Sequence, residues 1–590
     1  MKNIKKLFSI LAVACIISIS ISLFACDTPL DNRPHGGENI GVGDIIGSID
    51  MEIGNGDRDS SYTESSATKI TFSGSSVSVS GSGASVSGAD VTINTDGVYI
   101  LSGSTDDGSV TVSGSANAKV QLVLDGVEIT NANGPAFNIT NGKKVIFTLA
   151  NGSVNKVADG AAYNIYDGAA LIDGAIYSKA DLVFNGEGEL TVDGNNAHAI
   201  VSKDKITFTG GKYTVVSKSS GIFGKDSVKI ANADIKINAG TDAIKSDNAL
   251  EDTKGFIYIE SGSLDIEANN DGIQAYNVAN ISGGDIKIKT TSTSSTLSAK
   301  AIKGGNGVAI SSGSFAIDSQ DDAIHSNGSI AISGGSFEIS TKDDGIHADK
   351  TLGISGGNIH INKSYEGIEG TDIIISDGYV EINSTDDGMN ASGGNDTNAG
   401  DKFAASFGTI NISGGYIIMH NEGDGVDSNG SVEISGGVVL VDGPSHGGNG
   451  SFDYDSSAKI YGGVVITLGT SDMAQNFTEA TQGSILVSTN GYFTAGTTLS
   501  LCDENGNVIL AFTSTKSFNG ALFSAPEIEK GKTYTFYTGA TVEGLDENGY
   551  AHNTIQTGGE SCGSITVDEL VCGRGAGAPG GMPGGRPPRH

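Results

Sequence analysis

The sequence has little of several residue types, and each shortage narrows the class of protein. Its 590 residues include no tryptophan and only nine prolines, most of them near the two ends, so the chain is neither collagen-like nor a proline-rich linker. No arginine occurs between residues 59 and 573. Catalysis by an arginine base is therefore excluded over that stretch.

Positive charge is also scarce. Lysine and arginine number 35 against 69 aspartates and glutamates, which gives a formal net charge of −34. Such a surface repels nucleic acid and anionic membranes, because affinity for phosphate requires lysine and arginine. The excess of carboxylates suits cations, or partners that cations bridge. We therefore expect no nucleic-acid partner.

Cysteine occurs five times, and one copy ends a processing segment. A basic start, MKNIKK, precedes an apolar run that ends in LFAC at residues 23–26. This pattern resembles a bacterial lipobox. It implies a signal peptide over residues 1–26, a lipid on Cys26 that anchors the protein to the membrane, and a place on the extracellular face of the cell membrane. A plain membrane anchor is the alternative. Cys502, Cys562 and Cys572 remain, and a bridge between the last two stays open.

Glycine, by contrast, is abundant, with 87 copies in the chain, and many of them belong to a sequence repeat. A triplet of the Asp-Gly-Ile type recurs with a basic period of 22 residues, and longer spacings indicate inserted loops. Its aliphatic member, the anchor, falls at Ile200, Ile222, Ile244, Ile273, Ile302, Ile324, Ile346, Ile368, Met389 and Val426. Each period holds short alternating runs between turn signals. We predict coils of three short strands, an all-β fold that resembles the right-handed parallel β-helix of the pectate-lyase type.

The period also predicts the domain boundaries. Residues 27–64 are polar and aperiodic and are expected to form a disordered linker. The β-helix is assigned to residues 65–465. From 466 to 575 the period is lost but strands continue, so we expect a small β-rich cap over the last coil, whose open edge would otherwise invite aggregation. Residues 576–590 are rich in Gly and Pro and are expected to be disordered.

Stacked coils would place acidic residues in columns, because residues one period apart lie ~4.8 Å apart in a parallel solenoid. Ten aspartates near the anchor are candidate metal ligands: Asp242, Asp271, Asp321, Asp322, Asp343, Asp344, Asp349, Asp386, Asp387 and Asp424. Two unit charges ~5 Å apart repel by about 3 kcal/mol at an effective dielectric near 20. Protons, lysines or a bound cation must offset this repulsion. Oxygen-only ligands favour calcium, Ca²⁺, which we predict between adjacent coils.

A plainer explanation is that these aspartates serve the turns, because Asp and Asn side chains bond nearby backbone amides at corners. It accounts for one aspartate per turn, but less well for doubled aspartates in consecutive coils. His325 and His347 lie one period apart, and we interpret them as stacked surface residues.

The lipobox, the coils with DDGIHAD and ISGG, the β-rich C-terminal section and the GAPGGMPGGRPPRH tail together resemble the bacterial carbohydrate-binding β-helix family. That family was recognised through a cellulose- and polygalacturonate-binding protein of a cellulolytic clostridium. The resemblance covers most of residues 70–560. It implies a non-catalytic, Ca²⁺-binding protein that holds acidic plant cell-wall polysaccharide such as polygalacturonate, with cellulose as a second ligand. The acidic turns at 321–324, 343–346 and 386–389 match the family pattern, whereas Lys300 and Glu366 depart from it.

Two other functions stay open. A polysaccharide lyase would need a lysine base, for which Lys300 and Lys303 lie beside the acidic column. A structural or adhesive surface protein would use Ca²⁺ only to stiffen the coils. Lys300, Lys303, Tyr276 and Tyr365 are the candidates for polysaccharide contact, and the lack of tryptophan weakens the case for cellulose. We expect the chain to act as a monomer.

Overall fold

The computed structural model describes residues 40–168, 170–392 and 408–573. They belong to one compact unit, Glu38–His590. The predicted signal peptide with Cys26, and the predicted tail, lie outside the described residues. The helices are α1 (Val42–Ile46), α2 (Asn55–Arg58) and a 3-10 turn at Glu64–Ser66. In the described part of the chain, no helix has the length and apolar character needed to span a membrane.

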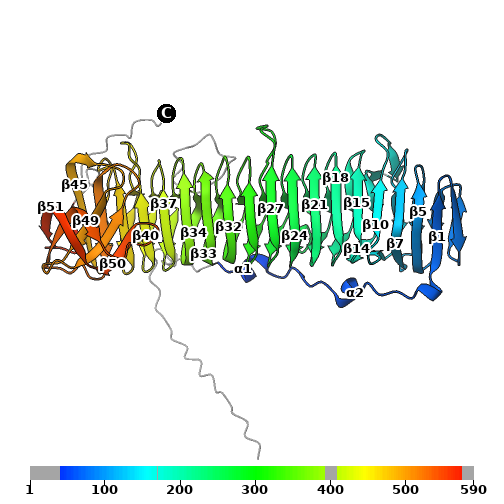
Figure 1. The fold of residues 1–590 in the computed structure, drawn as a ribbon, viewed down its shortest axis with the longest axis horizontal. Coiled ribbons are helices and arrows are strands. Elements are labelled where there is room, and N and C mark those ends of the chain that lie inside the picture. Colours follow the sequence, from blue (N-terminus) through cyan, green and yellow to red (C-terminus); the bar gives the residue numbers. More distant parts are fainter. Residues whose placement is uncertain (1–39, 169, 393–407, 574–590) are drawn as a thin grey trace, which may run out of the picture. The chain divides into compact units, whose positions relative to one another are not determined.

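The strands stack into three parallel columns, so that each coil contributes one strand to each column (Figure 1). The first column, which begins at the anchors, contains β8 (Phe137–Asn141), β13 (Gly174–Ser178), β16 (His198–Ser202), β19 (Ile222–Gly224), β22 (Ile244–Ser246), β25 (Ile273–Ala275), β28 (Ile302–Gly304), β31 (Ile324–Ser326), β35 (Met389–Ala391), β38 (Val426–Ser428) and β41 (Phe452–Tyr454). Three long strands turn the corners and serve more than one column: β32 (Ser329–Ser340), β33 (Ile346–Ser364) and β34 (Ile368–Ser384).

The other two columns follow the same order along the chain. The second contains β9 (Lys144–Leu149), β14 (Asp181–Gly186), β17 (Lys205–Phe208), β20 (Ser227–Ile230), β23 (Phe256–Ile259), β26 (Val278–Ile281), β29 (Gly307–Ile310), β36 (Thr409–Ile412), β39 (Ser431–Ile434) and β42 (Ser457–Ile460). The third contains β10 (Val154–Ala158), β15 (Glu189–Gly194), β18 (Lys212–Ser217), β21 (Ala233–Ala239), β24 (Gly262–Ala268), β27 (Asp285–Thr290), β30 (Ser314–Asp318), β37 (Tyr416–His420), β40 (Val438–Asp442) and β43 (Val464–Gly469). The predicted parallel β-helix with three strands per coil is confirmed.

The register of the coils is the one that the 22-residue period predicts. Ile324 pairs with Ile346, Ile346 with Ile368, and Ile368 with Met389. Alternate side chains of each strand point inward, so Ile, Val and Phe form ladders in a continuous core. The Phe315 and Phe337 rings stack with centroids 4.5 Å apart. Such stacked pairs contribute ~0.5–1.5 kcal/mol beyond their buried area.

The Gly-Gly pair that recurs in the ISGG motif has a conformational cause. Its second glycine has a positive φ, with 106° at Gly335 and 105° at Gly357, and Gly378, which follows Asp377 at the equivalent corner, has 107°. Residues with a Cβ rarely adopt this conformation. The pair therefore fixes the corner between the second and third columns.

The first coils are less regular. The antiparallel pairs β1–β2 (Thr68–Ser73, Ser76–Ser80) and β3–β4 (Ala84–Ser87, Asp90–Ile93) begin the stack. Parallel pairing then continues through β5 (Gly97–Thr105), β6 (Ser109–Ser113) and β7 (Lys119–Thr130). A hairpin of β11 (Ile165–Asp167) and β12 (Ala170–Ile172) is inserted before β13.

The expected linker follows a defined path from residue 40 onward. The Lys229 Nζ donates to the carbonyl oxygens of Asp50 and Glu52 at 2.9 and 2.7 Å. Arg58 pairs with Glu260 at 2.7 Å. These contacts hold residues 40–64 against the second column, so this part of the predicted disordered linker is ordered. Composition did not reveal this path, because its contacts join residues that lie 177 to 202 positions apart in the sequence.

The parallel stack ends in an antiparallel cap. Strand β43 pairs antiparallel with β48 (Phe518–Ala525), which pairs with β45 (Gly483–Phe493). A second sheet has the order β50-β47-β46-β49-β51, with β46 (Thr498–Cys502), β47 (Val508–Thr513), β49 (Thr533–Val542), β50 (Tyr550–Thr554) and β51 (Gln556–Thr566). The remaining short strands are β44 (Glu479–Ala480) and β52 (Val571–Cys572). The cap has its own apolar core, and covers the edge that the last coil would otherwise expose.

Candidate functional site: an acidic column along the coils

The acidic column is formed by the residues two positions before each anchor, at the corner that leads into the first-column strands. In chain order these are Asp242, Asp271, Lys300, Asp322, Asp344, Glu366, Asp387 and Asp424. Every aspartate among them is buried. Buried carboxylates are rare unless they are paired, hydrogen-bonded or bound to a metal. Each oxygen of the column therefore needs a partner.

One oxygen of each aspartate binds the backbone of the next coil. The Oδ1 atoms accept backbone N–H groups in a ladder: Asp242 from Asp271 at 3.3 Å, Asp271 from Lys300 at 2.9 Å, Asp322 from Asp344 at 3.1 Å, Asp344 from Glu366 at 3.1 Å, Asp387 from Asp424 at 2.6 Å and Asp424 from Gly450 at 2.5 Å. The plainer explanation, in which aspartates serve the turns, therefore holds for this oxygen. It leaves the second oxygen to be accounted for.

Lysines neutralise the N-terminal part of the column. The Lys245 Nζ lies 2.9 Å from Asp242 Oδ2. The Lys300 Nζ is buried and lies 2.5 Å from Asp322 Oδ2 and 2.8 Å from Asp321 Oδ1. Burial alone would lower the pKa of Lys300, but the two carboxylates outweigh it and raise that pKa. Lys300 is thus a buried counter-ion of the column.

Asp271 is less well compensated. Its Oδ2 atom is buried and has no hydrogen-bond partner among the described residues. Burial raises the pKa of Asp271, and the nearby Lys303 opposes this only in part. Lys303 itself is half-buried and donates to the Ser298 hydroxyl at 3.0 Å.

Two buried histidines occupy the middle of the column. The His325 Nδ1 lies 2.8 Å from Asp322 Oδ2. The His347 Nδ1 lies 3.2 Å from Glu369 Oε2 and 3.3 Å from Asp344 Oδ2. Burial alone would lower the pKa of His347, but Asp344, Glu369 and Asp322 raise it to about 10. A protonated imidazole therefore supplies positive charge here.

The C-terminal part of the column is the most acidic. Ligand oxygens of Asp387, Asp424 and Asp427 lie within 4.8 Å of one another. Burial and the charges of Asp424, Asp427 and Asp386 raise the pKa of Asp387 to about 8. Burial, followed by Glu369, Asp344 and Asp387, raises the pKa of Glu366 to about 10. A cation bound at this cluster would stabilise the ionised carboxylates.

The donor atoms decide which metal each cluster fits. Asp387, Asp424 and Asp427 offer oxygen alone, the ligand type that Ca²⁺ prefers. The cluster of Asp321, Asp322 and Asp343 is also all-oxygen, but Lys300 already neutralises two of its members. The clusters around His347 include an imidazole nitrogen, which suits transition metals rather than Ca²⁺. The cluster at Asp387 therefore fits Ca²⁺ best.

The other predicted site residues lie around this column. Asp321 and Asp386 are half-buried, and Asp343 is exposed to solvent. Asp349 Oδ1 faces the His347 Nε2 at 3.6 Å. Tyr276 and Tyr365 are about half exposed, at 50% and 47%.

Sequence reasoning missed the residues that complete the clusters. His325 and His347 were interpreted as surface residues, yet their side chains are only 1% and 2% exposed. Glu369 and Asp427 were not considered as ligands. All four occupy the position directly after the anchor. His325 pairs with His347 and His347 with Glu369, and Asn390 stands between Glu369 and Asp427 in the same register. Aligning this position along the repeat would have revealed them.

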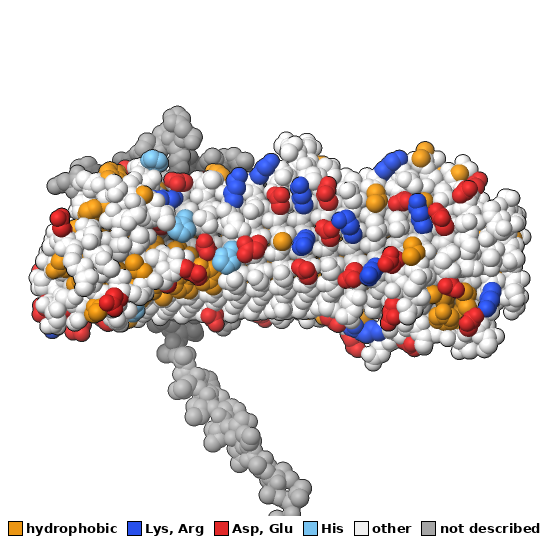
Figure 2. Space-filling view, viewed as in Figure 1, with side chains coloured by type: hydrophobic (Ala, Val, Ile, Leu, Met, Phe, Trp, Pro, Cys, Tyr) orange, Lys and Arg blue, Asp and Glu red, His pale blue; other side chains and the backbone are white. Residues whose placement is uncertain are grey.

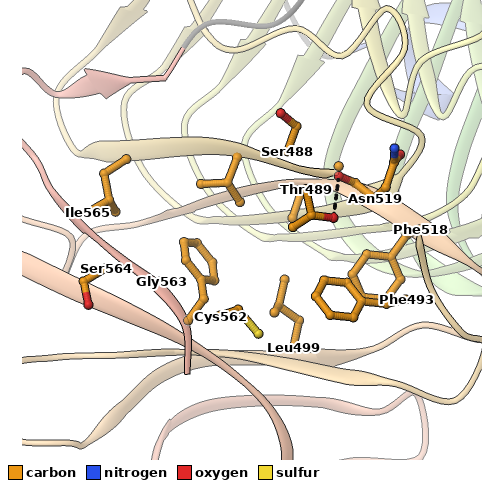
Figure 3. A pocket seen from close by; sticks show the side chains of 14 residues that line it. Ser488, Thr489, Phe493, Leu499, Phe518, Asn519, Cys562, Gly563, Ser564 and Ile565 are labelled. Carbon is orange, nitrogen blue, oxygen red and sulfur yellow. Dashed lines mark hydrogen bonds between the residues drawn. The ribbon is translucent and has the colours of Figure 1, made fainter. Parts of the chain in front are cut away.

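The cap contains a separate apolar pocket, drawn in Figure 3. It is lined by side chains such as Phe493, Leu499 and Phe518, and the dashed line marks the hydrogen bond that the Thr489 hydroxyl donates to the Asn519 carbonyl at 3.4 Å. Cys562, beside it, is a free thiol, as are Cys502 and Cys572, so the bridge that stayed open at Cys562–Cys572 is not formed. Charged groups are missing from this lining, which makes it unsuited to an acidic ligand.

Comparisons with known proteins found one matching family and two similar proteins. The profile of a family described as carbohydrate-binding domain-containing protein matches residues 87–345 and 340–503. A carbohydrate-binding domain-containing protein of Acetivibrio thermocellus is 36% identical over 126 residues, which is 21% of this chain and 44% of the relative's own length. A solved polysaccharide lyase-like protein from C. thermocellum has 34% identity and a TM-score of 0.38, covering 38% of this chain and 92% of that one. On the family match, the chain belongs to the carbohydrate-binding domain-containing proteins.

Proposed function

We propose that this protein is a non-catalytic surface lipoprotein that holds acidic polysaccharide, with polygalacturonate as the expected ligand, in a Ca²⁺-dependent manner. The observation that carries the proposal is the all-oxygen cluster of Asp387, Asp424 and Asp427 at the end of the acidic column. Family membership supports carbohydrate as the partner. A lipid on Cys26, a place on the cell surface and a monomeric state belong to the same proposal.

Charge explains why a cation is needed. The protein carries a formal charge of −34, and the face seen in Figure 2 shows lysines interspersed with carboxylates rather than a large basic patch. A polyuronate would be repelled by such a surface. A bound Ca²⁺ ion would attract carboxylates of the protein and of the uronate, and so bridge the two. Asp387 keeps one oxygen on the backbone of the next coil, which fixes the position of its carboxylate in the cluster.

The contacts of the lysines argue against a lyase. A general base must be deprotonated, and its pKa should lie near the working pH. Lys300 is buried between two carboxylates that raise its pKa. It is therefore held protonated and shielded from a polymer. Lys303 remains as a base candidate, and a product assay tests it.

The same contacts bear on a structural or adhesive role. The Oδ1 ladder shows that the column stabilises the stack of coils even without any ligand. A protein in which Ca²⁺ only stiffened the coils would retain this ladder. The glycan assay below separates this role from polysaccharide binding.

The test is a pull-down of the full mature chain on insoluble polygalacturonate, with Ca²⁺ or with a chelator, and on cellulose in parallel. We expect retention on polygalacturonate with Ca²⁺, release by chelator and recovery when Ca²⁺ is restored. Lower thermal stability in chelator without any glycan retention would support the adhesive role instead. Ultraviolet absorbance from unsaturated uronate products would establish a lyase and overturn the non-catalytic assignment.

A further inference from the structure

A strip of lysines lies apart from the acidic column, at the opposite ends of the first-column strands. Ser178 pairs with Ser202, and Ser202 with Gly224. The residues that follow them are Lys179, Lys203 and Lys225, one in each of three successive coils. The Lys203 and Lys225 N–H groups donate to the carbonyls of Ser178 and Ser202 at 2.8 and 2.9 Å. We call these three residues the lysine strip, whose members lie ~4.8 Å apart at the backbone.

Aromatic rings form the floor beneath the strip. The Lys203 Nζ lies 5.3 Å from the centre of the Tyr177 ring and 5.7 Å from that of Phe223. Tyr177, Phe223, the three lysines and Asp247 line one hollow. Two apolar side chains, Ile172 and Val201, pack with the rings. Lys203 over the two aromatic rings, in a hollow open to solvent, can bind a carboxylate of a sugar chain while the half-buried Phe223 ring contacts an apolar sugar face.

A buried polar group without a partner points to a ligand. The Tyr177 hydroxyl is fully buried and has no hydrogen-bond partner among the described residues. Such a group normally finds an acceptor, because leaving it unpaired costs about 1–3 kcal/mol. A sugar hydroxyl or carboxylate that moves Lys203 aside would give this O–H its missing acceptor.

The strip has charge available for a ligand. Lys179 pairs with Asp167 of the β11–β12 hairpin, and Lys203 lies 3.9 Å from Asp173, a long and therefore weak pair. Within the described residues, the Lys225 Nζ has no hydrogen bond or ion pair. Asp247 follows in the next coil and Tyr276, half exposed, in the one after it. The polar line thus continues over five coils, as an extended polymer requires.

We propose that the lysine strip, with Tyr177 and Phe223, is a binding subsite for a uronate segment of an acidic polysaccharide. This inference rests on the proposed function and locates its contact surface. It replaces Lys300 as an expected lysine contact, because Lys300 is buried between Asp321 and Asp322, and leaves Lys303 as a separate candidate. The ligand carboxylates pair with Lys203 and Lys225, and sugar hydroxyls reach Asp247 and the Tyr177 hydroxyl.

The experiment compares the affinity of the full mature chain for oligogalacturonate, with Ca²⁺ present, by calorimetric titration. The test variant is Lys203→Met with Lys225→Met, which keeps the apolar stems on the rings and removes both charges. The matched control is Lys212→Met with Lys236→Met, two exposed lysines of the third column, with side chains 62% and 68% exposed. We expect the test variant to bind at least about tenfold more weakly, and the control to bind like the wild type.

Further arms keep the outcome decisive. Tyr177→Phe, which removes only the unpaired hydroxyl, should also weaken binding, and fully methyl-esterified polymer should show no difference between wild type and test variant. Melting temperatures of all variants establish that they are folded. If the wild type binds and the test variant binds equally well, the subsite is refuted while the proposed function stands. If the wild type itself fails to bind, both are refuted.

Discussion

Replacing Asp387 with asparagine is expected to stabilise the metal-free protein and to remove most of the stabilisation that Ca²⁺ gives. Burial and the charges of Asp424, Asp427 and Asp386 raise the pKa of Asp387 to about 8, against about 4 for an unfolded chain. The folded state therefore retains a proton that the unfolded state has lost. Between these two pKa values, the metal-free stability must fall as the pH rises.

The magnitude follows from the interval between the unfolded pKa and the working pH. At pH 7 that interval is about three units, or about 4 kcal/mol at 1.36 kcal/mol per unit. Asparagine is neutral and retains an oxygen for the Asp424 N–H, which Asp387 now accepts at 2.6 Å. In chelator at pH 7, the Asp387→Asn protein should therefore be more stable than the wild type, by up to about 4 kcal/mol.

Ca²⁺ narrows this difference. An ion at a hundredfold excess over its dissociation constant stabilises the wild type by about 2.7 kcal/mol, and the variant loses most of this gain with its ligand oxygen. An advantage of about 4 kcal/mol for the variant should therefore shrink to roughly 1–2 kcal/mol. Unfolding by urea, with and without Ca²⁺ at pH 5 and pH 7, measures both effects. Asp265→Asn is the control, because that carboxylate is exposed and paired with Lys236 at 2.7 Å. A variant that is equally destabilised in both conditions would show that Asp387 is only a turn residue.

Two further substitutions test other contacts. Asp442 is buried at the junction with the cap, where it accepts the Thr515 N–H at 2.9 Å; burial would raise its pKa, but hydrogen bonds from His420, Ser514 and Thr515 hold it below its usual range. Its contribution is thus present above the unfolded pKa and lost as the pH falls through the folded one. Asp442→Ala should therefore cost about 1–3 kcal/mol at pH 7, because buried donors lose their acceptor, and the free energy of unfolding should fall less steeply toward acid pH than in the wild type; an equally steep fall would contradict this. Lys300→Met should cost about 3–5 kcal/mol, because it leaves two buried carboxylates without their cation, yet leave glycan affinity unchanged below its melting temperature; a selective loss of affinity would restore Lys300 as a polysaccharide contact.

The repeat made the coil register predictable, because the aliphatic anchors fix which residues stack. The column of Asp322, Asp344, Glu366 and Asp387 follows directly from it, and the pairing of their anchors agrees. Which oxygen bonds the next backbone could not be predicted, since that depends on side-chain rotamers. The buried position of His347 beside Glu369 of the following coil was not predicted, because Glu369 lies outside the Asp-Gly-Ile triplet on which the repeat was aligned.

The lysine strip illustrates a second limit. Lys179, Lys203 and Lys225 stand one per coil, but the first lies before the clear repeats begin, and the hairpin that borders it is an insertion without period. Their contact with Tyr177 and Phe223 depends on packing that spans three coils. The acidic residues of the repeat give no sign of this lysine strip.

The most direct measurement is the anomalous difference density of a crystal grown with Ca²⁺, examined at the acidic column. We expect a peak among the carboxylate oxygens of Asp387, Asp424 and Asp427, and none in a crystal of the Asp387→Asn protein. If the crystals grow at a Ca²⁺ concentration that saturates the protein in solution and the density still shows no peak at this cluster, a calcium site at the end of the column is contradicted.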